Sequence, residues 1–179
     1  VPVDTPHGPF EADEHPRRDT SAEKLAALKP LHPEIEGFSI TAGNACGAND
    51  AAAAVAVADE RLAREDLGLP TLARVRSWAS VARDPAETGL TPTHAIPKAL
   101  GRVGMTLSDV DLFEINEAFA SVPLAAVRRL GLDPDTVNVN GSGCSLGHPV
   151  AATGTRMVVT LVHELRRRGG GVGVASMCA

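Results

Sequence analysis

Three residues whose side chains can move a proton or donate a hydrogen bond stand at the ends of apolar runs. Asn116 follows the run 110–115, His148 closes a glycine-rich turn, and Cys178 lies late in the run that begins at Val172. A histidine accepts or donates a proton near neutral pH, a thiol does so where its surroundings lower its pKa, and a carboxamide donates hydrogen bonds. These residue types are suited to general acid–base chemistry.

Each of the three also has a plainer interpretation in its local context. His148 could cap a helix or pack in the core, and Cys178 could be an inert core residue of a strand. Asn116 could simply cap the helix that follows it. Taken one at a time, the residues leave both interpretations open.

The turn before His148 indicates how this side chain would behave. Pro149 suits the first residue of a helix, so His148 is predicted at or just before a helix N-terminus. The positive end of the helix dipole disfavours an imidazolium there. A neutral His148 could then act as a base or as a hydrogen-bond donor.

A rival interpretation of the same turn is a dinucleotide-binding loop. Its glycines read Gly141-x-Gly143-x-x-x-Gly147, which is one residue longer than the G-x-G-x-x-G fingerprint. Glu164 also comes too early, and within a helix, to be the acid that binds a ribose. The turn therefore favours a site built around His148.

The elements that position these residues alternate between short apolar runs and longer helical ones. Residues 1–36 are rich in proline and contain a helix only near 21–28. Strands separated by helices of 10–20 residues are typical of crossover connections, so an α/β sheet is expected. The predicted strands are 38–41, 73–82, 110–115, 137–140 and 172–179, and the predicted helices are 51–67, 94–103, 118–130 and 149–168.

Polar residues gather where the predicted strands turn into helices, at 44–50, 116–117 and 142–148. These turns lie at the carboxyl ends of strands, where open α/β sheets place their sites. Cys178, late on the last strand, could reach the same edge. The sequence therefore predicts one site at this edge.

Composition restricts the class of partner. The chain is 44% hydrophobic but only 3% aromatic, so its core must consist mainly of alanine, valine, leucine and isoleucine. A net charge of -5 argues against a general nucleic-acid binder, whose affinity depends on neutralising phosphates. The basic run 166–168 closes a helical segment, where cations suit the helix dipole. No apolar stretch approaches the length of a membrane span, so no membrane partner is expected.

The cysteines indicate the compartment. Cys46, Cys144 and Cys178 are an odd number in a chain too long to need disulfides, which favours free thiols and a cytoplasmic location. No metal site is predicted. The chain begins with valine and ends on an apolar run without a following turn, so a fragment or an incomplete chain is expected.

Several motifs, in order, resemble those of the thiolase family. Residues 116–120 (Asn-Glu-Ala-Phe-Ala) resemble its Asn-Glu-Ala-Phe motif, and residues 147–149 (Gly-His-Pro) resemble its Gly-His-Pro motif. Residues 177–178 (Met-Cys) resemble the approach to its C-terminal cysteine. The flanks agree as well, with 138–141 (Asn-Val-Asn-Gly) before the histidine motif and 153–156 (Thr-Gly-Thr-Arg) after it.

A further motif, over residues 41–50, resembles the loop on the coenzyme A side of a thiolase. It reads Thr-Ala-Gly-Asn-Ala, followed by Gly47, Asn49 and Asp50. The order and spacing of all these motifs agree over residues 15–179. The chain is therefore identified as resembling the C-terminal half of a thiolase.

The resemblance implies an acyltransferase that forms or cleaves 3-oxoacyl-coenzyme A. In thiolases an N-terminal cysteine takes the acyl group, a histidine deprotonates that cysteine, and a second cysteine moves the proton on the substrate α-carbon. Matched by motif, His148 is the histidine, Cys178 is the second cysteine, and Asn116 holds a water that forms an oxyanion hole with His148. One fixed donor to such an oxyanion is typically worth about 3–4 kcal/mol.

The resemblance also implies that coenzyme A or acyl-coenzyme A binds as substrate, with no covalently bound cofactor. Phe119 could instead be a core residue, and Arg17 could be merely solvated. The positions that match the family's coenzyme A contacts are Ala42, Ala45, Cys46, Ala118, Phe119 and Arg17.

Some residues depart from the family pattern. Cys46 stands where serine is usual, Ala151 replaces a common glycine, and 142–145 (Ser-Gly-Cys-Ser) is an unusual filling of the turn. These departures concern substrate size and loop shape. None of the three cysteines matches the motif of the nucleophile, so the isolated chain is predicted to be inactive.

The fold implied by the resemblance is a layered α/β/α half, with a mixed five-stranded sheet flanked by helices. Residues 1–36 would be the tail of the loop (lid) domain, and 37–179 the C-terminal domain, incomplete at its C-terminal end. The expected partners are the N-terminal thiolase half, as the same gene product or a separate chain, and further copies in a homo-oligomer. Alternatives are a non-catalytic scaffold, an acyl-coenzyme A-binding subunit of a multi-chain complex, and a thiolase-fold aldolase.

Overall fold

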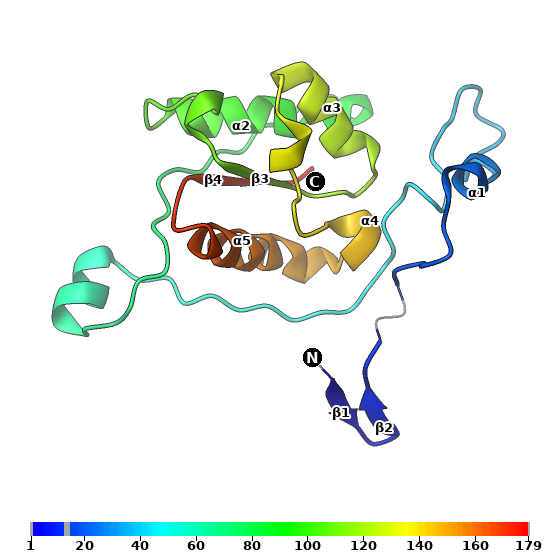
Figure 1. Cartoon of the computed structure of the whole chain (residues 1–179). Coiled ribbons are helices and arrows are strands. Elements are labelled where there is room, and N and C mark those ends of the chain that lie inside the picture. The colour runs from blue at the N-terminus through cyan, green and yellow to red at the C-terminus, as the bar shows by residue number, and fades with distance from the viewer. Residues whose placement is uncertain (1, 13–14, 179) are drawn as a thin grey trace.

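The centre of the molecule consists of three layers. The computed structural model describes residues 2–12 and 15–178, and its central layer is the parallel pair β3 (Leu112–Ile115) and β4 (Gly173–Ser176). Helices α2 (Pro92–Gly101) and α3 (Ser121–Leu130) cover one face of this pair, and α5 (Val150–Arg167) covers the other (Figure 1). The predicted α/β class is confirmed.

One apolar cluster joins the strands to α2 and α3. Ile115 of β3 and Ala126 of α3 are completely buried, and Ile96 of α2 is 1% exposed. Burying an aliphatic side chain of the size of isoleucine stabilises a fold by about 1.5–3 kcal/mol. The cluster comprises Ile96, Leu100, Phe113, Ile115, Val122, Ala126 and Leu132.

The register of the strand pair sets the position of the site. Ile115 lies opposite Ser176, and the pair extends one step further because the N–H of Asn116 donates to the carbonyl of Ser176 at 2.9 Å. Since the strands are parallel, both carboxyl ends lie at the same edge. Asn116 therefore leaves the sheet directly after β3, and Cys178 follows two residues after the end of β4, at the same edge.

The strand predicted at 137–140 is cut short after one residue. Val137 bridges to Phe113 in parallel, and the chain then turns at Asn138, whose φ is 51°. The Asn138 carboxamide continues the ladder, because its Oδ1 accepts the N–H of Ile115 at 2.7 Å and its Nδ2 donates to the carbonyl of Ile115 at 2.8 Å. Asparagine tolerates the left-handed region, so this turn needs no glycine.

The helices predicted at 94–103, 118–130 and 149–168 form, with ends within a few residues of the prediction. Gly131 ends α3 with a φ of 67°, the left-handed stop that the sequence indicates. The final strand forms over four of its predicted residues, as β4. The remaining elements are β1 (Val3–Thr5), β2 (Gly8–Phe10), α1 (Ala22–Ala26), η1 (Leu62–Asp66), η2 (Pro85–Leu90), η3 (Leu107–Asp109), η4 (Pro134–Thr136) and α4 (Gly143–Leu146).

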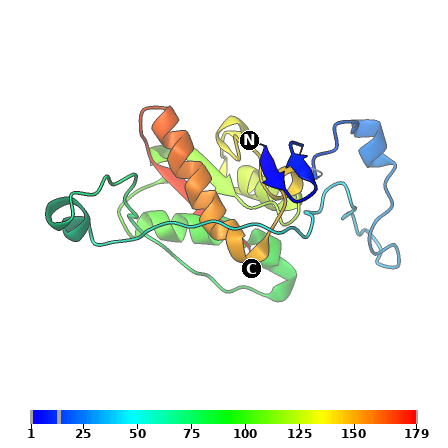
Figure 2. The same ribbon diagram turned by 90° about the horizontal axis from the view of Figure 1, so that it is seen from below.

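Three predicted elements are wrong. The strands at 38–41 and 73–82 are extended chain without a ladder partner, apart from one bridge between Thr41 and Pro30. The helix predicted over 51–67 coils only at its end, from residue 60, and 51–59 is extended. Figures 1 and 2 show this stretch passing on the α5 side of the molecule without joining the sheet.

The physical reason is that these segments bury little apolar surface. Val57 is 81% exposed, Val75 74% and Trp78 72%. A strand needs a neighbour for its backbone groups, and a helix of this composition needs an apolar surface to pack on. A mixed five-stranded sheet was expected. Of this sheet, the described residues form only the pair β3 and β4 and the single bridge between Phe113 and Val137, and β1 and β2 form a separate hairpin.

Crossing a bilayer requires a helix that is both long and apolar. None of the helices of the described residues meets this requirement.

Candidate active site

The carboxamide of Asn116 and the imidazole of His148 meet at the end of β3. Asn116 is completely buried. Its Nδ2 lies 3.3 Å from Nε2 of His148, which is 32 residues further along the chain. The structure thus brings together two of the three side chains that were predicted to be catalytic.

Cys178 arrives at the same edge from β4. It follows Ser176 by two residues, and Ser176 is bonded to the backbone of Asn116. Its thiol is partly buried against the apolar cluster. Burial raises the pKa of this thiol. The backbone thus brings Cys178 to the same edge, while the convergence of its thiol with Asn116 and His148 stays a prediction.

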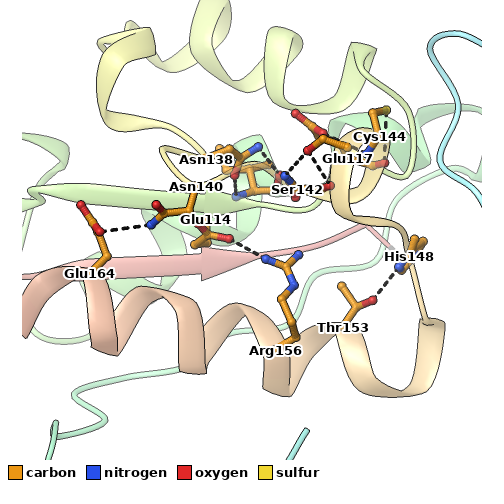
Figure 3. A network of polar contacts seen from close by, with 12 residues as sticks. Glu114, Glu117, Asn138, Asn140, Ser142, Cys144, His148, Thr153, Arg156 and Glu164 are labelled. Carbon is orange, nitrogen blue, oxygen red and sulfur yellow. Dashed lines mark hydrogen bonds and ion pairs between the residues drawn. The ribbon is translucent and has the colours of Figure 1, made fainter. Parts of the chain in front are cut away.

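The imidazole of His148 is held at its other nitrogen as well. Nδ1 lies 2.8 Å from Oγ1 of Thr153, a completely buried residue in the first turn of α5 (Figure 3). The backbone N–H of His148 points at two oxygens of the 41–50 loop, Oδ1 of Asn49 at 3.2 Å and the carbonyl of Gly47 at 3.4 Å. Ring and backbone are both fixed.

A buried ion pair lies behind the histidine. Nη1 of Arg156, on α5, donates to Oε2 of Glu114, on β3, at 3.0 Å (Figure 3). Burial raises the pKa of the Glu114 carboxyl, although the nearby Arg156 opposes the shift. The pair therefore joins α5 to the strand that ends in Asn116.

The pKa of His148 is lowered, first by burial and then by the charge of Arg156. The direction agrees with the predicted neutral histidine. His148 directly precedes Pro149, the N-cap of α5, so the predicted place just before a helix N-terminus is confirmed, although the helix begins at Val150 and not at Pro149. Burial and the Arg156 cation on α5 act in the same direction as the predicted helix end.

The 41–50 loop lies between the two motif turns. The N–H of Cys46 donates to the carbonyl of Ala118 at 3.1 Å, and Ala45 forms a bridge with Phe119. Ala48 forms a parallel bridge with His148. The loop assigned to coenzyme A by resemblance therefore contacts both the asparagine motif and the histidine motif.

Glu117 anchors the glycine-rich turn. Its Oε2 accepts the N–H of Cys144 at 3.0 Å, and the thiol of Cys144 donates to the carbonyls of Glu117 and Asn44, each at 3.7 Å (Figure 3). Burial and then the Glu117 charge raise the pKa of Cys144 to about 11. Cys144 is thus a structural thiol of the turn.

A cavity of about 340 Å³ adjoins the same loop. Thr41, Gly43 and Asn44 line one side of it, and α1 lines the other with Leu25. A Cβ on Gly43 would lie 2.5 Å from a methyl carbon of Leu25, so a larger residue there would require the exposed leucine side chain to move.

The residues predicted to contact coenzyme A differ in exposure. Ala45, Cys46 and Ala118 are half-buried, whereas Ala42 and Arg17 are exposed. Phe119 is 41% exposed, which excludes a plain core role for its ring. For Arg17 the solvated interpretation stays open.

Sequence reasoning assigned no role to four residues around His148. Thr153 and Arg156 belong to a motif it had noted, and their spacing of three on α5 places them on one face. That spacing was a usable signal. Glu114 lies within an apolar run and Asn49 within a loop, so their contacts depend on tertiary structure alone. The four are Asn49, Glu114, Thr153 and Arg156.

The described ranges 2–12 and 15–178 contain no group of three or more histidine, cysteine, aspartate or glutamate side chains that could hold a metal ion.

Comparison with known families defines the class of protein. The thiolase C-terminal domain matches residues 69–179, and the thiolase N-terminal domain matches residues 1–61. The chain belongs to the thiolase family.

Individual relatives agree with this assignment. The acetyl-CoA acetyltransferase of Pseudomonas aeruginosa is 48% identical over 169 residues, which cover 94% of this chain and 42% of the relative. The crystal structure of the Bacillus anthracis acetyl-CoA acetyltransferase superposes with a TM-score of 0.86 at 44% identity, over 100% of this chain and 46% of that one. Human mitochondrial 3-ketoacyl-CoA thiolase in complex with CoA gives a TM-score of 0.85 at 38% identity, over 99% and 44%. The chain thus spans less than half the length of the relatives it matches.

Proposed function

We propose that this chain supplies the histidine, the second cysteine and the asparagine of a thiolase that forms or cleaves 3-oxoacyl-coenzyme A. The observation that carries the proposal is the 3.3 Å contact between Asn116 Nδ2 and His148 Nε2 at the sheet edge where Cys178 also emerges. His148 is the base for a nucleophilic cysteine, and Cys178 transfers the proton on the substrate α-carbon. Asn116 orients the water that stabilises the thioester oxyanion.

Coenzyme A is the proposed substrate carrier. The 41–50 loop contacts both catalytic motifs, Phe119 presents an exposed ring, and the cavity beside α1 adjoins the loop. The structure of the human mitochondrial relative was determined in complex with CoA. This similarity supports CoA as the ligand of the present chain. Arg17, Ala42, Ala45, Cys46, Ala118 and Phe119 remain the proposed contacts.

The nucleophile is proposed to come from an N-terminal thiolase half. Burial raises the pKa of Cys46, Cys144 and Cys178 alike, whereas an acyl-accepting thiol needs a lowered pKa. Val57 and Val75, both mostly exposed, are apolar surface that such a half could cover.

The proposal has four further parts. They are a domain division at residue 36, a homo-oligomer, a cytoplasmic location and a place in fatty-acid metabolism.

Thiolysis of acetoacetyl-CoA, the smallest 3-oxoacyl-CoA, tests the function. The 179-residue chain alone is expected to be inactive. A chimera in which it replaces the matching part of the Pseudomonas aeruginosa relative is expected to turn over, and His148→Ala in that chimera should abolish the activity. Robust turnover by the chain alone would contradict the missing nucleophile. A folded chimera that binds CoA without turnover would favour the acyl-CoA-binding subunit instead.

A further inference from the structure

Thr153 makes two hydrogen bonds with a single hydroxyl group. The residue is completely buried in the first turn of α5. Its Oγ1 lies 3.0 Å from the carbonyl oxygen of Pro149. It also lies 2.8 Å from Nδ1 of His148 (Figure 3). The directions of these bonds determine where the imidazole carries its proton.

A hydroxyl has one proton to donate, and a carbonyl oxygen can only accept. With the Thr153 proton directed to the Pro149 carbonyl, Oγ1 is left to accept from the His148 ring. The donor is then Nδ1–H. Which ring nitrogen carries the proton is set by the hydrogen bond that the other atoms of the pocket impose.

The opposite side of the ring agrees with this assignment. Nε2 faces Nδ2 of Asn116 at 3.3 Å. A carboxamide nitrogen only donates, so it requires a lone pair on Nε2. Oδ1 of Asn116 is buried without a hydrogen-bond partner and points toward Gly143, where an added Cβ would lie 3.3 Å away. In this orientation of the carboxamide, the partners on β3 and α5 favour the same tautomer.

We propose that Thr153 is a positioning residue that holds the His148 proton on Nδ1 and so leaves Nε2 free as the base. The inference deepens the proposed thiolase function and rests on it for its catalytic meaning. When a cysteine is activated, its S–H bond breaks, a bond forms between that proton and Nε2, and the electron pair remains on sulfur. Thr153 Oγ1 accepts from Nδ1–H before and after this step.

The tautomer can be measured directly in the 179-residue chain labelled with ¹⁵N-histidine. Long-range ¹H–¹⁵N spectra distinguish a protonated ring nitrogen from one with a lone pair, and His148→Gln assigns the resonances. The expected result is a protonated Nδ1 and an unprotonated Nε2. A protonated Nε2, which needs the Asn116 carboxamide turned over, would overturn the proposal without any variant.

Variants of the hydroxyl separate positioning from packing. Thr153→Val keeps the shape and removes the acceptor, so the preference for the Nδ1–H tautomer should weaken to the part that Asn116 alone supports. Thr153→Ser should retain the wild-type spectrum, and Thr155→Val, two residues along the same helix, is the matched control. An unchanged tautomer in folded Thr153→Val would also overturn the inference.

Kinetics in the chimera give the catalytic consequence. Thr153→Val should lower kcat roughly tenfold to a hundredfold, the cost of losing a hydrogen bond to a charged ring, with little change in KM. The acidic limb of its pH profile should move to lower pH, because the imidazolium loses an acceptor. Thr153→Ser should restore both. If the wild-type chimera has the expected tautomer but does not turn over, the proposed thiolase function fails and the positioning role of Thr153 stands. If it turns over but carries the His148 proton on Nε2, the positioning role fails and the proposed function stands.

Discussion

At the scale of single residues, the protonation of His148 depends on a charge that does not touch it. Arg156 lies on α5 with Glu114 as its partner, and it lowers the pKa of the imidazole after the larger effect of burial. A base that takes a proton from a thiol must be neutral when the substrate arrives. The ion pair therefore acts on the site through its field.

Removing this charge should raise the pKa of His148. In Arg156→Gln the imidazolium no longer faces a cation, and the Glu114 carboxylate loses its partner. The histidine should then titrate at a higher pH, as measured by NMR of the His148 ring protons in the 179-residue chain. In the chimera, the acidic limb of the rate profile should move to higher pH.

Arg156→Lys is the matched control, because it keeps the charge. It should titrate close to the wild type, even where the shorter reach weakens the bond to Glu114. A His148 pKa that falls in Arg156→Gln, or that moves equally in both variants, would contradict the assigned role of the charge.

At the scale of elements, α5 carries the site at one end and an anchor at the other. Glu164 near its C-terminus is 3% exposed and bonds to Arg167 and Arg168, both largely in solvent. Nδ2 of Asn140 also donates to Glu164, at 3.1 Å. The carboxylate thus ties the end of α5 to the segment that leads into the histidine motif.

The contacts of Glu164 should contribute a part of the folding stability that is lost in acid. Bonds from Arg167, Arg168 and Asn140 lower the pKa of Glu164 to about 2, below its ordinary value of 4.5. Because the folded pKa is the lower one, the stabilisation is fully present above pH 4.5 and is lost as the pH falls toward 2. Glu164→Gln should lower the melting temperature near neutral pH, and the gap to the wild type should close across this window.

Circular dichroism melts over a pH series measure this gap. Arg166→Gln changes the charge of the same helix end without touching Glu164, and should show no such closing gap. A difference between Glu164→Gln and the wild type that stays constant with pH would contradict the titration of this carboxylate.

How far the sequence predicts these elements depends on whether the signal is local. The helix over 121–130 is indicated by its own periodicity and by Gly131, and β3 by an apolar run. Residues 51–59 are rich in alanine, a strong helix former, yet they are extended, because helical propensity without a packed face is a weak determinant. The conformation of this segment depends on whether another part of the protein offers a surface for it to pack on, and the local sequence does not contain that information.

The residues of the candidate site also differ in whether a local sequence signal predicts them. Motif order predicts Asn116, His148 and Cys178 as site residues, and the edge rule supports Asn116 and Cys178, which follow β3 and β4. Thr153 could not be given a role from its type, because its hydroxyl matters only once Pro149 and the imidazole are placed around it. Residues that act by position require coordinates.

At the scale of the whole molecule, apolar side chains outside the three layers face solvent. Val57, Val75 and Trp78 are each more than 70% exposed, and burying a valine side chain is worth about 1.5–3 kcal/mol. The segment with Trp78 nevertheless runs along α2, where Ser77 donates to the carbonyl of Ala99 and Lys98 to that of Ser80. Its backbone is held in place, and the Arg102 guanidinium lies over the indole ring, 5.3 Å from the ring centroid, while most of the Trp78 side chain faces solvent.

Trp78 is the single tryptophan of the sequence, so it can report what covers this surface. In the chain labelled with 5-fluorotryptophan, the one ¹⁹F resonance should show the H₂O/D₂O isotope shift of an exposed ring. Adding the unlabelled N-terminal half of the Pseudomonas aeruginosa relative should move the resonance and reduce that isotope shift, because the partner excludes water from the indole. Trp78→Phe should remove the signal. A complex that elutes as one species but leaves the resonance exposed would place the interface elsewhere, and the failure of any complex to form would contradict the proposed partner.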